Sequence, residues 1–168
     1  MEDDRLSDTE TLVDQIVTYL EANWDAEITS VNNTNKDEVK LEPLAATFIG
    51  EPPPSIQSFP TLVILTDFNE SEIWKETSEQ WGFTLSVGII VAIGELNIEK
   101  LQRMIWRYID DVIWKLLKDG HFAASDTVGF NLGNVGTPRK DWGPVLTNRK
   151  TSQYRQDARI ILEGVTSA

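Results

Sequence analysis

The most constraining feature of this sequence is a strict alternation of large and small residues from Trp81 to Ile93. Every odd position carries a large apolar side chain, while the even positions are small except for Ile90. A period of two places one set of side chains on each face of a β-strand. The pattern therefore predicts a strand with one deeply buried face and one smooth face that another backbone or subunit approaches closely.

Two helices flank this strand in the sequence. The first is expected from Thr9 to Trp24, and the second from Asn97 to Lys118, where Gly120 ends it. Each has apolar residues at helical spacing, and the first stripe is about 140° wide, which is typical of a helix lying on a core. The first stripe contains Leu12, Val13, Ile16, Val17, Leu20 and Trp24; the second contains Ile98, Leu101, Ile105, Tyr108, Ile109, Val112 and Leu116.

The other expected strands are shorter or less regular. Apolar or alternating segments predict strands at Phe59 to Thr66 and Tyr154 to Val165, with weaker candidates at Leu41 to Ile49 and Thr127 to Val135. Residues 1–8 are expected to fray, Asn32 to Asp37 to form a turn, and residues 29–58 and 120–153 to form long loops. The order predicts a single α+β domain spanning residues 1–168. Its sheet is mostly antiparallel, with two amphipathic helices packed on one face.

The reactive residues are few. The 168 residues include no Cys and a single His, His121, which excludes disulfides, thiolate catalysis, zinc ribbons and iron–sulfur clusters. No Gly-x-Ser-x-Gly or phosphate-loop motif is present. Asp67, Glu70 and Glu72 carry oxygen ligands, but in no calcium-loop spacing, and we interpret them as part of a loop. We therefore predict no catalytic, cofactor or metal site, and no enzyme activity.

Charge and hydropathy constrain the surroundings of the protein. The net charge of −12 argues against a nucleic-acid footprint over the whole surface, because phosphates would be repelled. The acidic N-terminus does not match a secretory signal, and the longest apolar segment is too short to span a bilayer. We expect synthesis in a cytoplasm and no membrane contact.

Two tryptophans of the second helix are candidates for an interface. On an ideal helix, Trp114 lies about 160° from the apolar stripe, among charged residues, and Trp106 lies on the flank of that stripe. Tryptophan is enriched at protein interfaces, so both residues predict a contact with another chain. The alternative is that a loop, for example residues 41–58, covers Trp114.

A local excess of basic residues is the second candidate. Between positions 139 and 159, six basic residues face two acidic ones, which gives +4 locally and −16 for the rest of the chain. Opposite charges on one chain suit head-to-tail contacts between copies, whereas the alternative is a solvated loop. The basic candidates are Arg139, Lys140, Arg149, Lys150, Arg155 and Arg159.

The order of elements resembles the tail terminator and tail-completion proteins of long-tailed bacteriophages. Four features over about 150 residues carry the resemblance. They are the opening helix Leu12–Leu20, the segment Phe59-Pro60-Thr61-Leu62-Val63-Ile64, the alternating strand that runs into a helix containing Arg103–Tyr108, and the closing Ala158–Leu162 after a glycine-rich loop. No invariant residue is carried over from the family.

The resemblance implies a structural virion protein of the tail or neck. Such a protein forms a homo-oligomeric ring, usually a hexamer, that caps the tail tube and contacts the head connector or head-completion protein. DNA passes through its channel without specific binding. The alternatives are another phage neck or baseplate component, a small ligand-binding regulatory α+β domain, and an enzyme with a carboxylate-based site.

Overall fold

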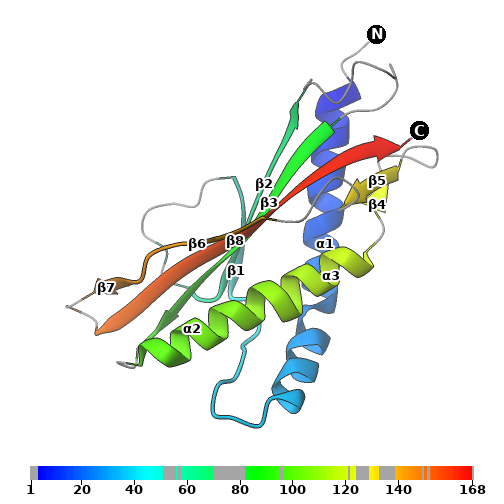
Figure 1. The fold of residues 1–168 in the computed structure, drawn as a ribbon. Coiled ribbons are helices and arrows are strands. Elements are labelled where there is room, and N and C mark those ends of the chain that lie inside the picture. The colour runs from blue at the N-terminus through cyan, green and yellow to red at the C-terminus, as the bar shows by residue number, and fades with distance from the viewer. Residues whose placement is uncertain are drawn as a thin grey trace.

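The computed structural model describes residues 4–50, 56, 58–69, 82–94, 97–120, 122–123, 129–132, 139–148, 150 and 152–167. Two long helices lie against a twisted sheet (Figure 1). In chain order the elements are α1 (Asp4–Thr34), β1 (Ala46–Ile49), β2 (Thr61–Asn69), β3 (Gly82–Ile93), α2 (Ile98–Arg107), η2 (Tyr108–Trp114), α3 (Lys115–Asp119), β4 (Phe122–Ala123), β5 (Gly129–Leu132), β6 (Arg139–Trp142), β7 (Leu146–Asn148) and β8 (Gln153–Ser167).

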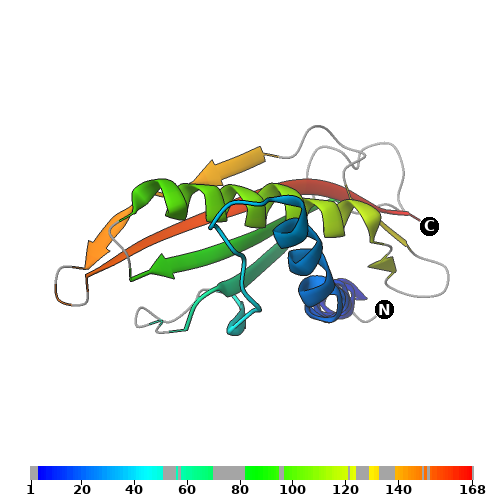
Figure 2. The same ribbon diagram turned by 90° about the horizontal axis from the view of Figure 1, so that it is seen from below.

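The sheet is mostly antiparallel. Six of its eight described strands follow the order β1-β2-β3-β8-β5-β4, and β6 and β7 also pair with β8. Among these described strands, β1 and β2 form the one parallel pair. The long strand β8 pairs with β3 on one side and, in succession along its other side, with β7, β6 and β5. Both helices cover the same face, so the predicted α+β architecture is confirmed (Figure 2).

The alternation that predicted β3 sorts its side chains onto two faces as expected. Leu85, Val87 and Ile89 are fully buried in the cluster beneath the helices. On the other face, called here the open face, a Cβ atom on Gly88 would lie 3.2 Å from the carbonyl oxygen of Ala158. That oxygen belongs to β8, which pairs with β3 in the plane of the sheet, so the close approach of another backbone or subunit to the smooth face stays a prediction.

Helix α1 is longer at both ends than predicted. It begins at Asp4, within the residues expected to fray, and it ends at Thr34 rather than Trp24. Its apolar stripe continues beyond Trp24 with Ile28 and Val31, both buried. Residues 29–34 therefore belong to the helix rather than to a loop, because burial of these two side chains stabilises three further turns.

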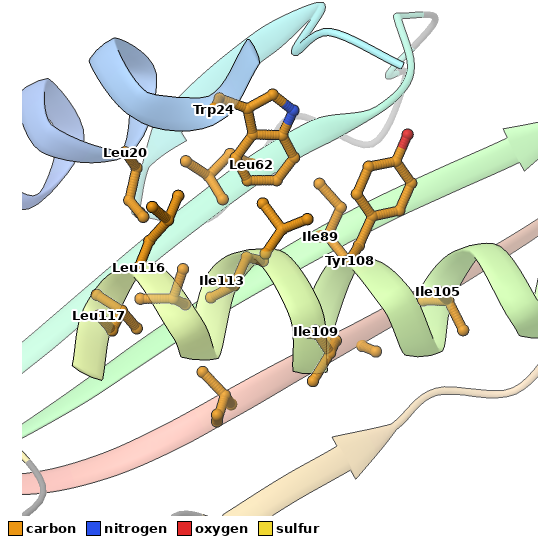
Figure 3. Close-up of a cluster of buried hydrophobic side chains, with 14 of the residues drawn as sticks. Leu20, Trp24, Leu62, Ile89, Ile105, Tyr108, Ile109, Ile113, Leu116 and Leu117 are labelled. Atoms are coloured by element: carbon orange, nitrogen blue, oxygen red, sulfur yellow. The ribbon is translucent and has the colours of Figure 1, made fainter. Parts of the chain in front are cut away.

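The second helix is continuous from α2 to α3 and contains a π-helical segment, η2. Asn97 caps its start by accepting a hydrogen bond from the Lys100 amide at 3.0 Å, and Gly120 follows its end. After Leu101, buried residues recur in pairs every four positions: Met104 and Ile105, Tyr108 and Ile109, Val112 and Ile113, Leu116 and Leu117. Figure 3 shows Ile105, Tyr108, Ile109, Ile113, Leu116 and Leu117 among them. In an ideal α-helix a four-residue spacing drifts by about 40° per step. The wider π turn compensates for that drift and keeps the pairs on the core.

The predicted stripe contains one error at the first residue of α2. Ile98 was expected in the core, but half of its surface is exposed. Met104, Ile113 and Leu117, which the ideal helix left out, are buried instead.

Polar contacts tie residues 35–45, called here the strap, to both helices. The Asn32 side chain accepts a hydrogen bond from the Leu41 amide at 2.8 Å and donates one to the Leu41 carbonyl at 3.0 Å. The rings of Trp24 and Tyr108 stack with centroids 5.8 Å apart, and both bind the Glu42 backbone through their polar atoms (Figure 3). These contacts hold the strap although it has no regular secondary structure.

Several predicted boundaries are corrected. The strands expected at Phe59 to Thr66, Leu41 to Ile49 and Tyr154 to Val165 are observed as β2, β1 and β8. The strand expected at Thr127 to Val135 is the shorter β5, and the presumed loop 120–153 also contains β4, β6 and β7. Strands β6 and β7 lie at the sheet's rim, where the burial of one face is too weak to impose an alternating pattern.

Candidate functional site

The prediction that Trp114 lies on an exposed helix face is wrong. It is partly buried and packs against the core. A hollow of about 420 Å³ beside it is lined by η2, α3 and the C-terminal half of α1. The segment that lies beside Trp114 is therefore the C-terminal part of α1, which was not predicted, rather than residues 41–58. The π turn also rotates the residues after Tyr108 around the helix axis, relative to an ideal α-helix.

The charges around Trp114 pair within the chain. The Lys115 ammonium lies 2.6 Å from Glu27 Oε1, and this contact raises the pKa of Lys115. Burial, and then the nearby Asp110 carboxylate, raise the pKa of Asp111. Lys140 of β6 lies 2.5 Å from Asp110 Oδ1. These contacts join α1 to α3 and β6 to η2.

Trp106, by contrast, is exposed as predicted, and the structure adds neighbours to it. It is 47% exposed and lies on the same helix stripe as Ile98 and Gln102. The Gln102 amide donates to Gln156 Oε1, and the Gln156 amide donates to the Gly143 carbonyl, each at 2.8 Å. This stripe therefore faces β8 and the chain that follows β6.

Strand β6 completes a surface that we call the aromatic edge. Trp142 is 43% exposed. In the strand register, Trp142 is opposite Ala158 and Lys140 is opposite Ile160. Both partners point toward the helices, so Trp142 and Lys140 lie on the helix side of the sheet. We use the name aromatic edge for Ile98 and Trp106 of α2 together with Arg139, Lys140 and Trp142 of β6; Lys140 and Trp142 lie on the helix side of β6, and Arg139 lies on its open face. Sequence reasoning missed Ile98 and Trp142; the large apolar Trp142 among polar, glycine and proline residues was the available signal.

The predicted basic candidates do not form one patch. Strand alternation places Lys140 on the helix side and Arg139, Arg155 and Arg159 on the open face. Arg139 and Arg159 share Asp141, each at 3.3 Å, and the Arg155 guanidinium lies 5.6 Å from the centre of the Phe59 ring. Lys150 is exposed, and Arg149 lies outside the described residues.

The far end of the sheet carries a second surface, which we call the acidic edge. It consists of the exposed residues Glu21, Asp25, Glu42 and Ile49, near β1. A hollow of about 310 Å³ opens there, and none of its lining residues is basic. It is lined by Glu21, Trp24, Asp25, Pro43, Leu44, Ala45, Ala46 and Thr47.

A smaller hollow of about 140 Å³ lies on the open face above Gly88. Val63, Leu65 and Ile90 supply its apolar walls, and Asp157 and Arg159 stand at its margin. It is too small for most metabolites, which occupy pockets of roughly 300–1,000 Å³.

Reactive groups do not converge in the described parts of the chain. No three Asp, Glu or His side chains there lie close enough to hold a metal ion. Asp67, expected in a loop, is instead part of β2, whereas Glu70, Glu72 and His121 fall outside the described residues. None of the described helices has both the length and the apolar character of a membrane span.

No protein-family model matches the chain, and no curated protein is significantly similar to it.

Proposed function

We propose that this chain is a structural virion protein, a tail terminator whose copies form a ring on the end of the phage tail tube. The observation that carries the proposal is the chemical difference between the two ends of the sheet. One end presents exposed tryptophans with Arg139 and Lys140, and the other presents carboxylates around a hollow.

Unlike edges favour head-to-tail contacts. A two-fold dimer needs a patch that complements itself, whereas two different complementary patches join copies in one direction. Such contacts close into a ring when the rotation between neighbours divides a full turn. A subunit with an aromatic edge and an acidic edge is suited to that kind of assembly.

The remaining roles follow from the bacteriophage resemblance. The observed fold is α+β, which is the class of the proteins that the chain resembles. The ring, a hexamer by this analogy, caps the tube, contacts the head connector or head-completion protein, and surrounds the passage for DNA. The net charge of −12 disfavours tight binding of the transiting DNA.

The test combines assembly with tube capping. The purified chain is examined by sedimentation velocity and native mass spectrometry over a wide concentration range, alone and with tail tubes of the phage that encodes it. We expect one closed oligomer, bound at tube ends and halting tube growth. A chain that stays monomeric alone, on tubes and with the connector would refute the proposal. Rings that bind other neck or baseplate parts, but not tube ends, would favour the alternative virion component.

A further inference from the structure

We infer that strand β7 of one copy pairs in antiparallel fashion with strand β1 of the next copy, so that the sheet continues from subunit to subunit around the ring. This inference rests on the proposed ring and specifies its contact. In the part of the chain that the structure describes, no strand pairs with the outer side of β1 or of β7. Each therefore presents backbone amide and carbonyl groups that another strand can bind.

Both strands are short and carry no charged residue, which distinguishes them from β6. Strand β1 consists of Ala46–Ile49, and β7 consists of Leu146–Asn148. Three residues of β6 are charged, and charges on an edge strand oppose the addition of another strand. On the rim formed by β6 and β7, strand addition is therefore expected at β7.

The strand directions match those of a head-to-tail repeat. Strand β1 is parallel to β2, both β2 and β8 are antiparallel to β3, and β7 is antiparallel to β8. Consequently, β1 runs in the direction of β8 and opposite to β7. Neighbouring copies in a ring differ by a fraction of a turn that is too small to reverse a strand. Strand β7 therefore meets the next β1 in antiparallel orientation, the commoner kind of strand pairing.

The positions of the two strands along the sheet also suit a closed ring. When the register is followed across β2 and β3, Thr47 is level with Ala158 of β8. Thr147 of β7 is opposite Tyr154 instead, and this offset amounts to roughly 14 Å at about 3.4 Å per residue. A sheet that closes on itself needs such a stagger, because its strands tilt relative to the axis. Strand β6 offers none, since Trp142 is itself opposite Ala158.

The side chains of the paired strands also match. The rotation between neighbours keeps the helix-covered face on the same side of the continued sheet. Leu146 lies on the open face, because its register partner Arg155 lies there, and it is 53% exposed. Phe48 lies on the open face too, opposite Val63, and is partly exposed. Placed directly opposite each other, Leu146 and Phe48 form an apolar cross-strand pair.

The charges beside the two strands are opposite in sign. With Leu146 opposite Phe48, the residues that follow β7 run beside the residues that precede β1. Lys150 is exposed after β7, and Glu42 is exposed before β1, on the acidic edge. Opposite charges favour this antiparallel register and steer the unlike ends of two copies together.

The experiment uses the absence of cysteine from the chain. A variant with Leu146→Cys and Phe48→Cys carries one thiol on each strand. Directly opposite residues of a strand pair lie within the Cα separation that a disulfide spans. Under mild oxidation, non-reducing gels should show a covalent ladder that ends at the size of the ring. The matched control is Asp141→Cys with Phe48→Cys, because Asp141 lies on the open face of β6, and it should stay uncross-linked.

Ala46→Pro tests the backbone part of the contact. The Ala45 amide donates to the Pro60 carbonyl within the chain at 3.0 Å, so the amide of Ala46, the next residue, points to the outer side of β1. Proline removes that donor and is tolerated where the amide of an edge strand faces solvent. In sedimentation velocity, the apparent Kd of assembly should rise at least about 10-fold, since one hydrogen bond of the contact is lost. Circular dichroism and urea unfolding verify the fold of each variant.

The outcomes separate the inference from the proposed ring. A ladder from the β7–β1 cysteine pair but not from the control, with weaker assembly of Ala46→Pro, supports the inference. No ladder, equal ladders from both cysteine pairs, or unchanged assembly of Ala46→Pro would each overturn it and leave the ring standing. If Phe48→Cys does not fold, Thr147→Cys with Thr47→Cys, the next pair in the same register, decides in its place. A wild type that never assembles, even on tail tubes, overturns both proposals.

Discussion

The two faces of the sheet are built from alternate residues of the same strands, yet one face is buried beneath the helices and the other is open. On β3, Leu85, Val87 and Ile89 lie fully buried beneath the helices. Between them in sequence, the small residues Ser86 and Gly88 lie on the open face and line a hollow there. Asp157 and Arg159 stand at the margin of this hollow. The difference shows that one strand pattern can supply most of the stabilising core and still leave a second face available for contacts.

The largest test of this comparison removes side chains from each face. Ile109, in η2, is fully buried against the helix-covered face, whereas Leu65 on the open face is 36% exposed. Ile109→Ala should lower the free energy of unfolding by about 3 kcal/mol, since it loses burial and leaves a cavity. Leu65→Ala should cost about 1 kcal/mol or less. Urea denaturation below the assembly concentration measures both; equal losses would mean that the two faces are equally covered.

A smaller effect separates two tryptophans of the same helix. Trp114 packs against the core, while Trp106 is 47% exposed. Trp114→Ala should cost about 2 kcal/mol, roughly half of the loss at a fully buried site, and Trp106→Ala less than about 1 kcal/mol. Thermal and urea unfolding compare them at equal concentration. A stable Trp114→Ala chain that fails only in assembly would restore the original view of Trp114 as an interface residue.

The strap on the helix side offers a third test. Asn32 makes two hydrogen bonds to the Leu41 backbone, nine residues away, whereas Asn23 makes a local one to the Tyr19 carbonyl. Asn32→Ala should cost about 1–2 kcal/mol, because two part-buried backbone groups lose their partner. Asn23→Ala controls for the helix propensity gained at both sites. Losses of similar size would show that the strap is not held through Asn32.

The smallest effect is expected at the end of the strap, and it depends on pH. The Arg107 side chain pairs with Asp37 through two hydrogen bonds and lowers the pKa of that carboxyl to about 2. The unfolded chain keeps an ordinary value near 4, so the contribution of the pair is complete above that pH and is lost as pH falls toward 2.

Asp37→Asn checks this directly. The difference in melting temperature between wild type and variant should be constant from pH 7 to pH 5 and should shrink between pH 4 and pH 2. Circular dichroism melts across this range provide the measurement. A difference that does not change with pH would show that the charge of Asp37 does not contribute.

The sequence predicted the fold well where one face of an element is buried. The alternation of β3 and the stripes of both helices follow from burial alone, so the architecture could be read before the structure was known. The prediction failed at α1 beyond Trp24, where Ile28 and Val31 continue the stripe amid polar residues. It also failed at β6 and β7, whose weak burial leaves no period to detect.

The candidate surfaces were less predictable. Trp106 was identified correctly as exposed, but Trp114 was misplaced, since an ideal helix of 3.6 residues per turn does not include a π turn. The basic segment appeared as one block because its residues are neighbours in sequence. Strand alternation then divided Lys140 from Arg139 and Arg159, and ion pairs engaged all three.

By itself, the sequence determined the periodicity of this protein: which strand has one buried face, which helices lie on it, and that no thiol or pair of histidines is present. Periodicity is a local property, fixed by residues a few positions apart. Only the tertiary structure decided the two edges, because it joined Gln102, one turn before Trp106, to Gln156 of β8 and set Glu21 and Asp25 around a hollow with Pro43–Thr47. Those juxtapositions depend on packing between segments distant in sequence, which no local pattern records.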